Sequence, residues 1–126
     1  MNSRLINALL FTVCFLLFGV LDSFGDSVKI TDRNIDIYGN SNQLSIGDII
    51  TIYDPDNILC GQFEVTEAGQ YGVIHIYGDD LTSPEIDEGP VPGDVLTIYL
   101  NDIEISPKNI DKLIWTRNRD LIQVNF

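Results

Sequence analysis

Basic residues, cysteine and histidine are all scarce in this chain of 126 residues. Seven lysines and arginines stand against 19 aspartates and glutamates, which gives a net charge of −12 at pH 7. A chain this acidic is repelled by nucleic acid and by anionic lipid, so we exclude both as non-specific partners. The single histidine, His75, and the two cysteines, Cys14 and Cys60, complete no zinc spacing and no catalytic motif. The sequence therefore predicts a protein that is not an enzyme.

The N-terminus carries the longest apolar segment. Residues 5–21 follow Arg4, and Ser23 and Gly25 then supply the small residues that signal peptidase requires at positions −3 and −1. We predict a signal peptide over residues 1–25, a secreted or cell-surface protein, and no membrane span after cleavage. An uncleaved membrane anchor is the alternative, because an apolar stretch of about 17 residues approaches the length of a spanning helix.

Residues 26–126 are sufficient for one domain with a single hydrophobic core. Cys60 is the only cysteine in this segment, so no disulfide can form within it, although an exported protein would meet oxidising conditions. We expect Cys60 to be buried as a small apolar residue, because it precedes Gly61 in an apolar stretch. The stability of the domain must then come from packing.

One phrase occurs twice, as Gly-Asp-Ile-Ile-Thr-Ile-Tyr at 47–53 and Gly-Asp-Val-Leu-Thr-Ile-Tyr at 93–99. Each copy begins with a Gly-Asp turn and continues into β-branched and aromatic residues, which suit a half-buried strand. Short apolar runs recur along the chain between turn residues, and no segment has a sustained 3.6-residue period. We predict an all-β fold, an antiparallel β-sandwich of the Ig-like kind. The expected strands are 35–38, 43–46, 49–53, 58–65, 73–77, 95–105, 113–116 and 121–126, with one helical turn at 107–112.

Strand alternation predicts which side chains face the core, because successive residues of a strand point to opposite faces. Trp115 lies in an apolar stretch near the C-terminus, and we expect it to anchor the core. His75 is expected on the outer face. The side chains expected to face inward are Ile50, Ile52, Ile74, Ile76, Leu96, Ile98 and Leu100.

Acidic side chains are concentrated in the turn at 54–57 and in the long loop at 78–94. Calcium is a hard cation that prefers carboxylate and carbonyl oxygens. Asp54 and Asp56 would satisfy the opening of an EF-hand loop, but Ile58 occupies the next ligand position, so we expect a site built from loop oxygens instead. A solvated acidic surface is the alternative. The candidate metal ligands are Asp54, Asp56, Asn57, Asp79, Asp80, Glu85, Asp87 and Glu88.

Three tyrosines, Tyr53, Tyr77 and Tyr99, each lie close to the end of an expected strand. Aromatic rings beside polar side chains can stack on the C–H faces of sugar rings. A carbohydrate-binding site at these tyrosines is therefore a second hypothesis for the function. Ordinary half-buried sheet tyrosines are the alternative, because antiparallel neighbours can place strand ends at opposite edges.

Several phrases of the predicted domain resemble those of extracellular β-sandwich modules found in large bacterial and archaeal surface proteins. The resemblance implies a non-enzymatic binding or structural module of the cell surface or extracellular matrix. Its implied partner is an extracellular protein or a polysaccharide. The phrases that carry the resemblance are Gly-Asp-Ile-Ile at 47–50, Tyr-Asp at 53–54, Leu-Cys-Gly at 59–61, Gly-Gln-Tyr-Gly at 69–72, Tyr-Gly-Asp-Asp at 77–80, Thr-Ser-Pro-Glu at 82–85, Asp-Glu-Gly at 87–89, Gly-Asp at 93–94 and Trp115.

The charge is unevenly distributed along the chain. Residues 32–104 hold 15 acidic side chains and the single base Arg33. An acidic body and a basic C-terminal segment could dock head to tail, which makes self-assembly a further hypothesis. The basic residues of the C-terminal segment are Lys108, Lys112, Arg117 and Arg119.

Overall fold

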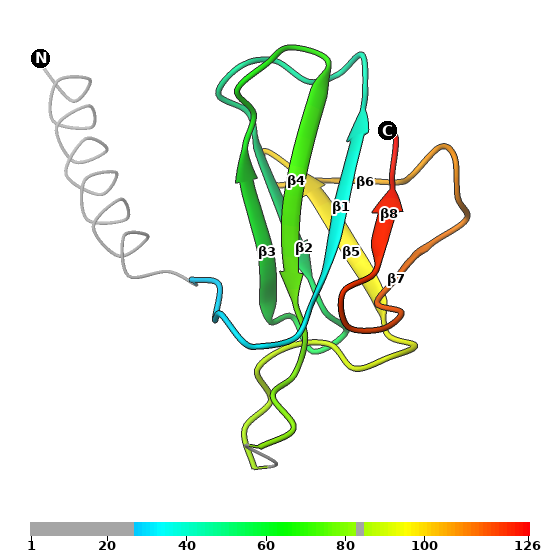
Figure 1. Ribbon diagram of the computed structural model, residues 1–126. Helices are drawn as coiled ribbons and strands as arrows, with labels where there is room; N and C mark the ends of the chain where they lie inside the picture. The colour runs from blue at the N-terminus through cyan, green and yellow to red at the C-terminus, as the bar shows by residue number, and fades with distance from the viewer. Residues whose placement is uncertain (1–26, 83–84) are drawn as a thin grey trace, which may run out of the picture.

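The structure is a computed structural model, and it describes residues 27–82 and 85–126. These residues form two β-sheets that face each other (Figure 1). No helix in this part of the chain is long and apolar enough to cross a membrane. The predicted signal peptide, residues 1–25, lies outside the described residues. The strands are β1 (Asn34–Asn40), β2 (Ile49–Tyr53), β3 (Leu59–Glu64), β4 (Gln70–Tyr77), β5 (Val95–Leu100), β6 (Ile103–Ile105), β7 (Leu113–Ile114) and β8 (Leu121–Gln123).

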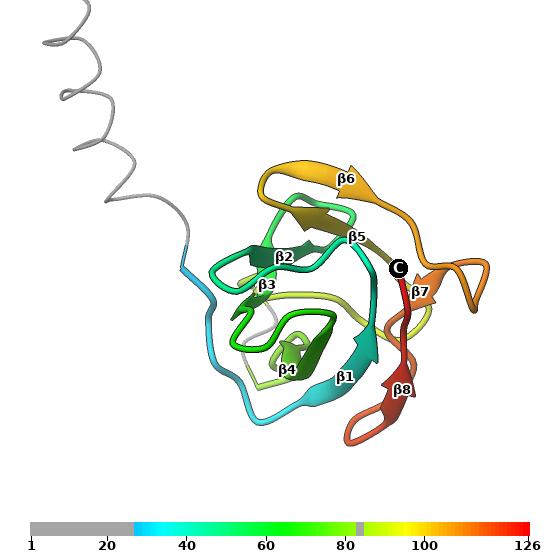
Figure 2. The same ribbon diagram turned by 90° about the horizontal axis from the view of Figure 1, so that it is seen from above.

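The first sheet has the strand order β4-β1-β8, and the second has the order β3-β2-β5-β6 with β7 paired to β5. Viewed from above, the two sheets lie on either side of the core (Figure 2). The prediction of an all-β, two-sheet fold is confirmed. The expectation of a wholly antiparallel arrangement is wrong, because β8 pairs with β1 in parallel, with Ile37 opposite Ile122. The chain returns to the end where β1 starts, and the Asp36 N–H donates to the Asp120 carbonyl before β8 begins.

The core lies where strand alternation predicts it. The indole of Trp115 is fully buried and its nitrogen donates to the carbonyl oxygen of Ile76 at 3.1 Å. Cys60 is buried, and its thiol donates to the carbonyl oxygen of Ile52. Leu100 is half-buried against the core. The other side chains that were expected to face inward are all buried, namely Ile50, Ile52, Ile74, Ile76, Leu96 and Ile98.

The expected single strand at 95–105 is wrong, because it is a hairpin of β5 and β6. The two residues between these strands, Asn101 and Asp102, have φ angles of 48° and 69°. Positive φ at both central residues is the requirement of a two-residue hairpin turn, and Asn and Asp tolerate it. The side chain of Asn101 accepts a hydrogen bond from the Ile49 N–H and donates one to Asp48, which fastens the turn to β2.

Two further expected elements are absent from the described residues. The segment 43–46 is not a strand, because Ser41 folds the chain locally by accepting a hydrogen bond from the Gln43 N–H on its hydroxyl. The segment 107–112 is not a helical turn. Its polar groups bond to the chain after β8 instead, since the Lys108 N–H donates to the Asn125 carbonyl at 2.7 Å. Both segments therefore run as turns and bends beside the sheets.

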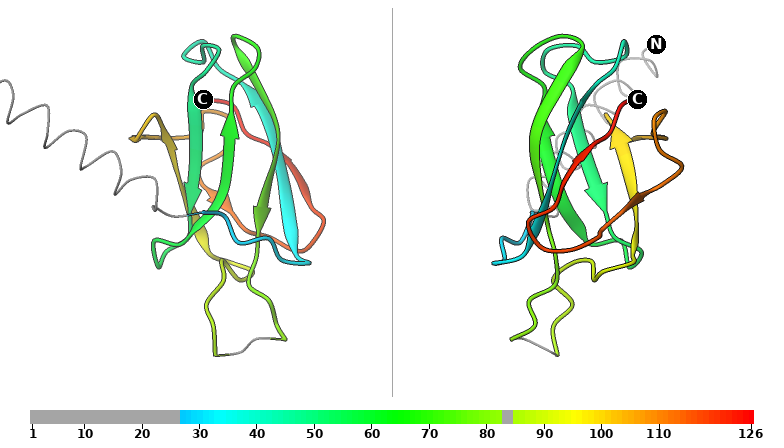
Figure 3. Two further views of the ribbon diagram at one scale, coloured as in Figure 1. Left: turned by 90° about the vertical axis from the view of Figure 1, so that its left-hand side faces the viewer. Right: turned by 45° about the vertical axis from the view of Figure 1, so that its right-hand side comes forward.

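The loop that connects β4 to β5 extends beyond one end of the sandwich (Figure 3). Its two arms are closed at the base, where the Asp79 N–H donates to the Pro90 carbonyl at 2.8 Å. A Cβ atom on Gly89 would lie 2.6 Å from the Tyr77 carbonyl oxygen, so the arms approach more closely than any other residue would allow. This closed base fixes where the acidic residues of the loop lie relative to the neighbouring turn after β2.

Candidate functional site

Asp54 begins the turn that connects β2 to β3. One of its carboxylate oxygens, Oδ1, accepts hydrogen bonds from the N–H groups of Asp56 and Ile58, both at 2.9 Å. This is the usual way in which an aspartate caps its own turn. The side chain is only 2% exposed, and its second oxygen, Oδ2, is buried with no hydrogen-bond partner among the described residues. A buried, unpaired carboxylate oxygen is costly, so it calls for a compensating positive charge or donor.

Two other carboxylates lie beside Asp54. One oxygen atom from each of Asp54, Asp56 and Asp87 lies within 4.8 Å of the other two. Asp56 belongs to the same turn, whereas Asp87 comes from the long loop, so the group joins two segments that are far apart in the sequence. Asp56 and Asp87 are exposed, which leaves the group open to solvent on one side. These three residues form an acidic group that could hold a metal ion.

The electrostatics of the group show that three negative charges are crowded together. Partial desolvation, a hydrogen bond with Asp56, and the charges of Asp54 and Asp56 together raise the pKa of Asp87 to about 6. Burial raises the pKa of Asp54 as well, although its two backbone hydrogen bonds oppose this effect. A cation bound among these oxygens would remove the repulsion and favour the charged form of all three side chains.

The other predicted ligands have different partners. Asp79 accepts a hydrogen bond from the Glu88 N–H, and Asp80 accepts two from Thr82. The Glu88 side chain is buried and forms an ion pair with Lys29 at 3.3 Å. Glu85 is exposed. None of these four residues belongs to the three-aspartate group.

Two of the three predicted tyrosines meet. The rings of Tyr53 and Tyr99 lie edge to face with centroids 5.5 Å apart on the outer face of the second sheet. They line a hollow of about 320 Å³ together with Thr51, Asn57 and Asp102. Asn57, which was predicted as a metal ligand, lines this hollow. The carbohydrate-binding hypothesis can therefore concern this pair together, whereas it stays a prediction for all three tyrosines.

Tyr77 lies apart from the other two tyrosines. It belongs to β4 in the first sheet, and its neighbours are His75 at a ring distance of 6.1 Å and a small hollow that also includes Ile30. His75 is exposed as expected and contacts the carboxylate of Asp36 through Nδ1. Tyr77 therefore lies on the first sheet, away from the Tyr53–Tyr99 hollow.

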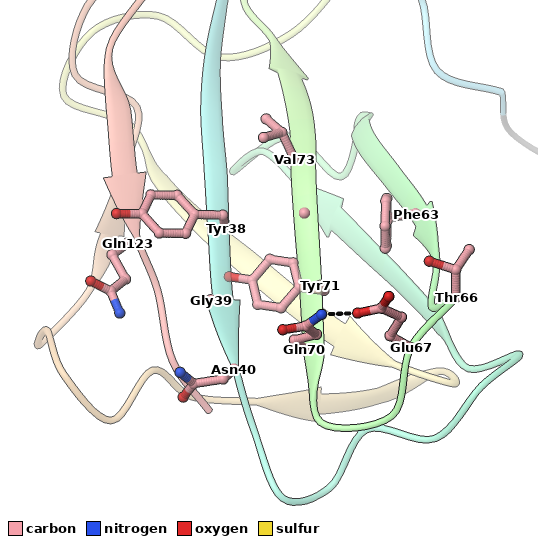
Figure 4. A pocket seen from close by; sticks show the side chains of 11 residues that line it. Tyr38, Gly39, Asn40, Phe63, Thr66, Glu67, Gln70, Tyr71, Val73 and Gln123 are labelled. Atoms are coloured by element: carbon pink, nitrogen blue, oxygen red, sulfur yellow. Dashed lines mark hydrogen bonds between the residues drawn. The ribbon is translucent and has the colours of Figure 1, made fainter.

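Sequence reasoning missed a larger hollow of about 560 Å³ near the opposite end of the sandwich from the long loop (Figure 4). Most of its residues come from four strands, for example Phe63 from β3, Gly72 from β4, Tyr38 from β1 and Gln123 from β8, and the turn between β3 and β4 supplies the rest. These strands are distant from one another in the sequence. The only sequence signal would have been the glycine inside β4, which often marks a bulge or a close approach of two backbones.

Comparison with known proteins found no matching family model, no similar curated protein and no similar solved structure. We therefore infer the function from the geometry and chemistry of this chain alone.

Proposed function

We propose that this protein is a secreted or cell-surface module without enzymatic activity, which binds or supports an extracellular protein or polysaccharide and is stabilised by calcium. The observation that supports the metal most directly is the buried Oδ2 of Asp54, which has no hydrogen-bond partner within residues 27–82 and 85–126 and belongs to a group with Asp56 and Asp87. Within the β-sandwich class, the Ig-like arrangement stays a prediction.

The chemistry of the group favours calcium over other common metals. All three side chains offer carboxylate oxygens, without the histidine or cysteine that zinc and copper prefer. Two oxygens that both bind calcium at 2.3–2.6 Å can lie up to about 5 Å apart, which fits the spacing of the group. Calcium takes six to eight oxygen ligands, so backbone carbonyls and water would complete the shell.

Calcium at this position would act as a clasp between the turn at 54–58 and the long loop. The loop is anchored at its base by the Asp79–Pro90 hydrogen bond, but Asp87 reaches the turn from further out. A cation that neutralises the three carboxylates would therefore add a second connection between these segments. A ligand that binds only the folded state at 100 times its Kd stabilises that state by about 2.7 kcal/mol.

Thermal melting of the full chain, produced in an exporting host, tests the calcium site. We expect calcium to raise the melting temperature relative to a chelator, and Asp87→Asn to abolish the rise. Asp111→Asn is the matched control, because it removes an exposed carboxylate outside the group and should keep the rise. The proposal is overturned if calcium has no effect on the wild type, or if Asp87→Asn responds as strongly as the wild type does.

Carbohydrate binding is a second candidate function, favoured by the edge-to-face pair of Tyr53 and Tyr99 beside its hollow. The hydroxyl of Thr51 and the amide of Asn57 line the same hollow and could pair with sugar hydroxyls. A glycan array tests this function directly. Retention of the wild type on a glycan, together with loss of retention in Tyr99→Ala, would support this surface as the site.

A further inference from the structure

We propose that the hollow across β3, β4, β1 and β8 binds a neutral oligosaccharide. This site lies apart from the calcium group and from the Tyr53–Tyr99 hollow, and it goes beyond the proposed function by assigning a ligand class to a new surface. Its volume is about 560 Å³, compared with about 320 Å³ for the Tyr53–Tyr99 hollow. Pockets of this size accommodate small organic ligands.

The floor of the hollow is made by a glycine. Gly72 has a φ angle of 126°, and a Cβ atom there would lie 2.7 Å from the Cβ of Tyr38. The register between β1 and β4 shifts at this point, where Tyr38 is opposite Gly72 and Ile37 is opposite Ile74, so Val73 is the extra residue of a bulge. The missing side chain and the bulge leave room on the first sheet beside Tyr38, next to the edge of the second sheet at β3.

Two aromatic rings provide apolar surface in the hollow. Tyr38 is 39% exposed on β1, and Phe63 is half-buried on β3. Figure 4 shows them on opposite sides of β4. Sugar rings present C–H groups on their faces, and exposed aromatic rings are suited to contact these groups. An elongated ligand that crosses β4 could therefore meet both rings.

Amide side chains surround these aromatic rings. Asn40, Gln70 and Gln123 line the hollow from three different strands. An amide offers both donors and acceptors, which matches the dual character of sugar hydroxyls. The Gln70 amide nitrogen donates to the Glu67 carboxylate (Figure 4), which leaves the amide oxygen of Gln70 to accept from a ligand.

The charge of the lining selects a neutral ligand. Among the residues that the structure describes, Glu67 is the only acidic side chain that lines the hollow, and no lysine or arginine does so. Phosphate, sulfate and acidic sugars would meet repulsion from Glu67 and from the net charge of −12. The three amides would lose hydrogen bonds to water beneath a lipid or a wholly apolar peptide. A neutral sugar offers hydroxyl groups that pair with the amides and C–H faces that contact the aromatic rings.

Isothermal titration calorimetry of the full chain, produced in an exporting host, tests the proposal with five neutral hexasaccharides: cellohexaose, xylohexaose, mannohexaose, maltohexaose and chitohexaose. We expect at least one of them to bind the wild type. Tyr38→Ala and Gln123→Ala should each raise the Kd by about tenfold or more, as expected for central contacts. Both side chains are exposed, so the variants should fold, which a melting curve would verify. Ile103→Ala is the control and should leave the Kd within about twofold, since this exposed side chain lies on β6 of the other sheet and lines no part of the hollow.

The proposal is overturned if no hexasaccharide binds, or if Tyr99→Ala abolishes binding while Tyr38→Ala and Gln123→Ala do not. The second result would place the sugar at the Tyr53–Tyr99 hollow. Titration in the presence of a chelator separates this proposal from the calcium site. The hollow and the three-aspartate group lie at opposite ends of β3. Sugar binding below the melting temperature should therefore persist without calcium. The effect of calcium on the melting temperature is measured separately, so either proposal can fail without the other.

Discussion

The indole nitrogen of Trp115 donates a 3.1 Å hydrogen bond to the carbonyl oxygen of Ile76 in β4. The same ring lies against Gly78, the first residue of the loop that follows β4. Trp115 thereby holds the point at which the long loop leaves the sheet. The Gly93 N–H donates to the Trp115 carbonyl, so the other arm of the loop is fastened to the same residue. Both arms of the acidic loop are therefore tied to one buried residue, one through its ring and the other through its main chain.

Gly78→Ala should destabilise the fold through this contact. A Cβ atom at position 78 would lie 2.5 Å from Cζ2 of Trp115, so the ring or the loop must shift. We expect a loss of about 1–3 kcal/mol in the free energy of unfolding, as for other overpacked sites. Urea denaturation measures it. In a Trp115→Leu background the same substitution should cost less, and equal costs in both backgrounds would show that the ring is not the obstacle.

Stability should fall at alkaline pH because of two buried groups. Burial raises the pKa of the Cys60 thiol and of the Tyr71 hydroxyl above their usual values. Their contribution to stability is complete below the unfolded pKa values, about 8.5 for cysteine and about 10 for tyrosine. It is lost as the pH rises further, because the unfolded chain releases these protons first.

Two variants separate the contributions of these groups. Cys60→Ala should flatten the fall in melting temperature that begins near the usual thiol pKa, whereas Tyr71→Phe should flatten the fall at higher pH. The Tyr71 hydroxyl donates to the Val124 carbonyl, so its replacement also lowers stability at neutral pH. The comparison therefore uses slopes against pH. An unchanged slope in either variant would mean that the group titrates normally in the folded state.

Asp80→Asn should leave the calcium-induced rise in melting temperature unchanged. The Asp80 carboxylate accepts two hydrogen bonds from Thr82 and does not belong to the three-aspartate group. Asp56→Asn should reduce the rise, because it removes a negative charge from the group. Parallel melts of both variants, with calcium and with a chelator, check this prediction. A rise that disappears in Asp80→Asn would extend the site into the outer part of the loop.

Self-association through the basic C-terminal segment should be sensitive to salt. The four basic side chains of residues 105–126 are exposed and form no ion pair within the described part of the chain. At low ionic strength we expect the sedimentation coefficient to rise with protein concentration, and at about 1 M salt we expect this rise to disappear. Arg117→Glu combined with Lys108→Glu should have the same effect as salt. A monomer at every concentration in low salt would exclude self-assembly.

The sheet interior could be predicted from the sequence because burial follows a period of two along each strand. Ile50 and Ile52, or Ile74 and Ile76, face the core for this reason alone. The hairpin between β5 and β6 was missed although its signal was present, since Asn101 and Asp102 interrupt the apolar run with two residues that tolerate positive φ. The parallel pairing of β1 with β8 had no comparable local signal.

The candidate sites depended on tertiary contacts, so the sequence could indicate them only in part. Asp54 and Asp56 share one turn, but the local sequence gave no reason to prefer Asp87 over Asp79 or Asp80 as their neighbour. The hydrogen bonds that close the base of the loop determine that Asp87, and not Asp79 or Asp80, lies beside Asp54 and Asp56. The large hollow was beyond prediction, because Tyr38 and Phe63 frame it only after β1 and β3 are brought to either side of β4.

The pairing of β1 with β8 has a consequence for how the chain folds. β1 is the central strand of its sheet, and one of its two neighbours comes from residues 121–123, close to the C-terminus. The Phe126 N–H, at the last residue, also donates to the Asn40 carbonyl. Contacts between residues so distant in the sequence form slowly, because a long loop must close first. The first sheet therefore cannot be completed until residues 121–123 have been synthesised, so β1 and β4 should wait for their third strand while the rest of the domain is being made.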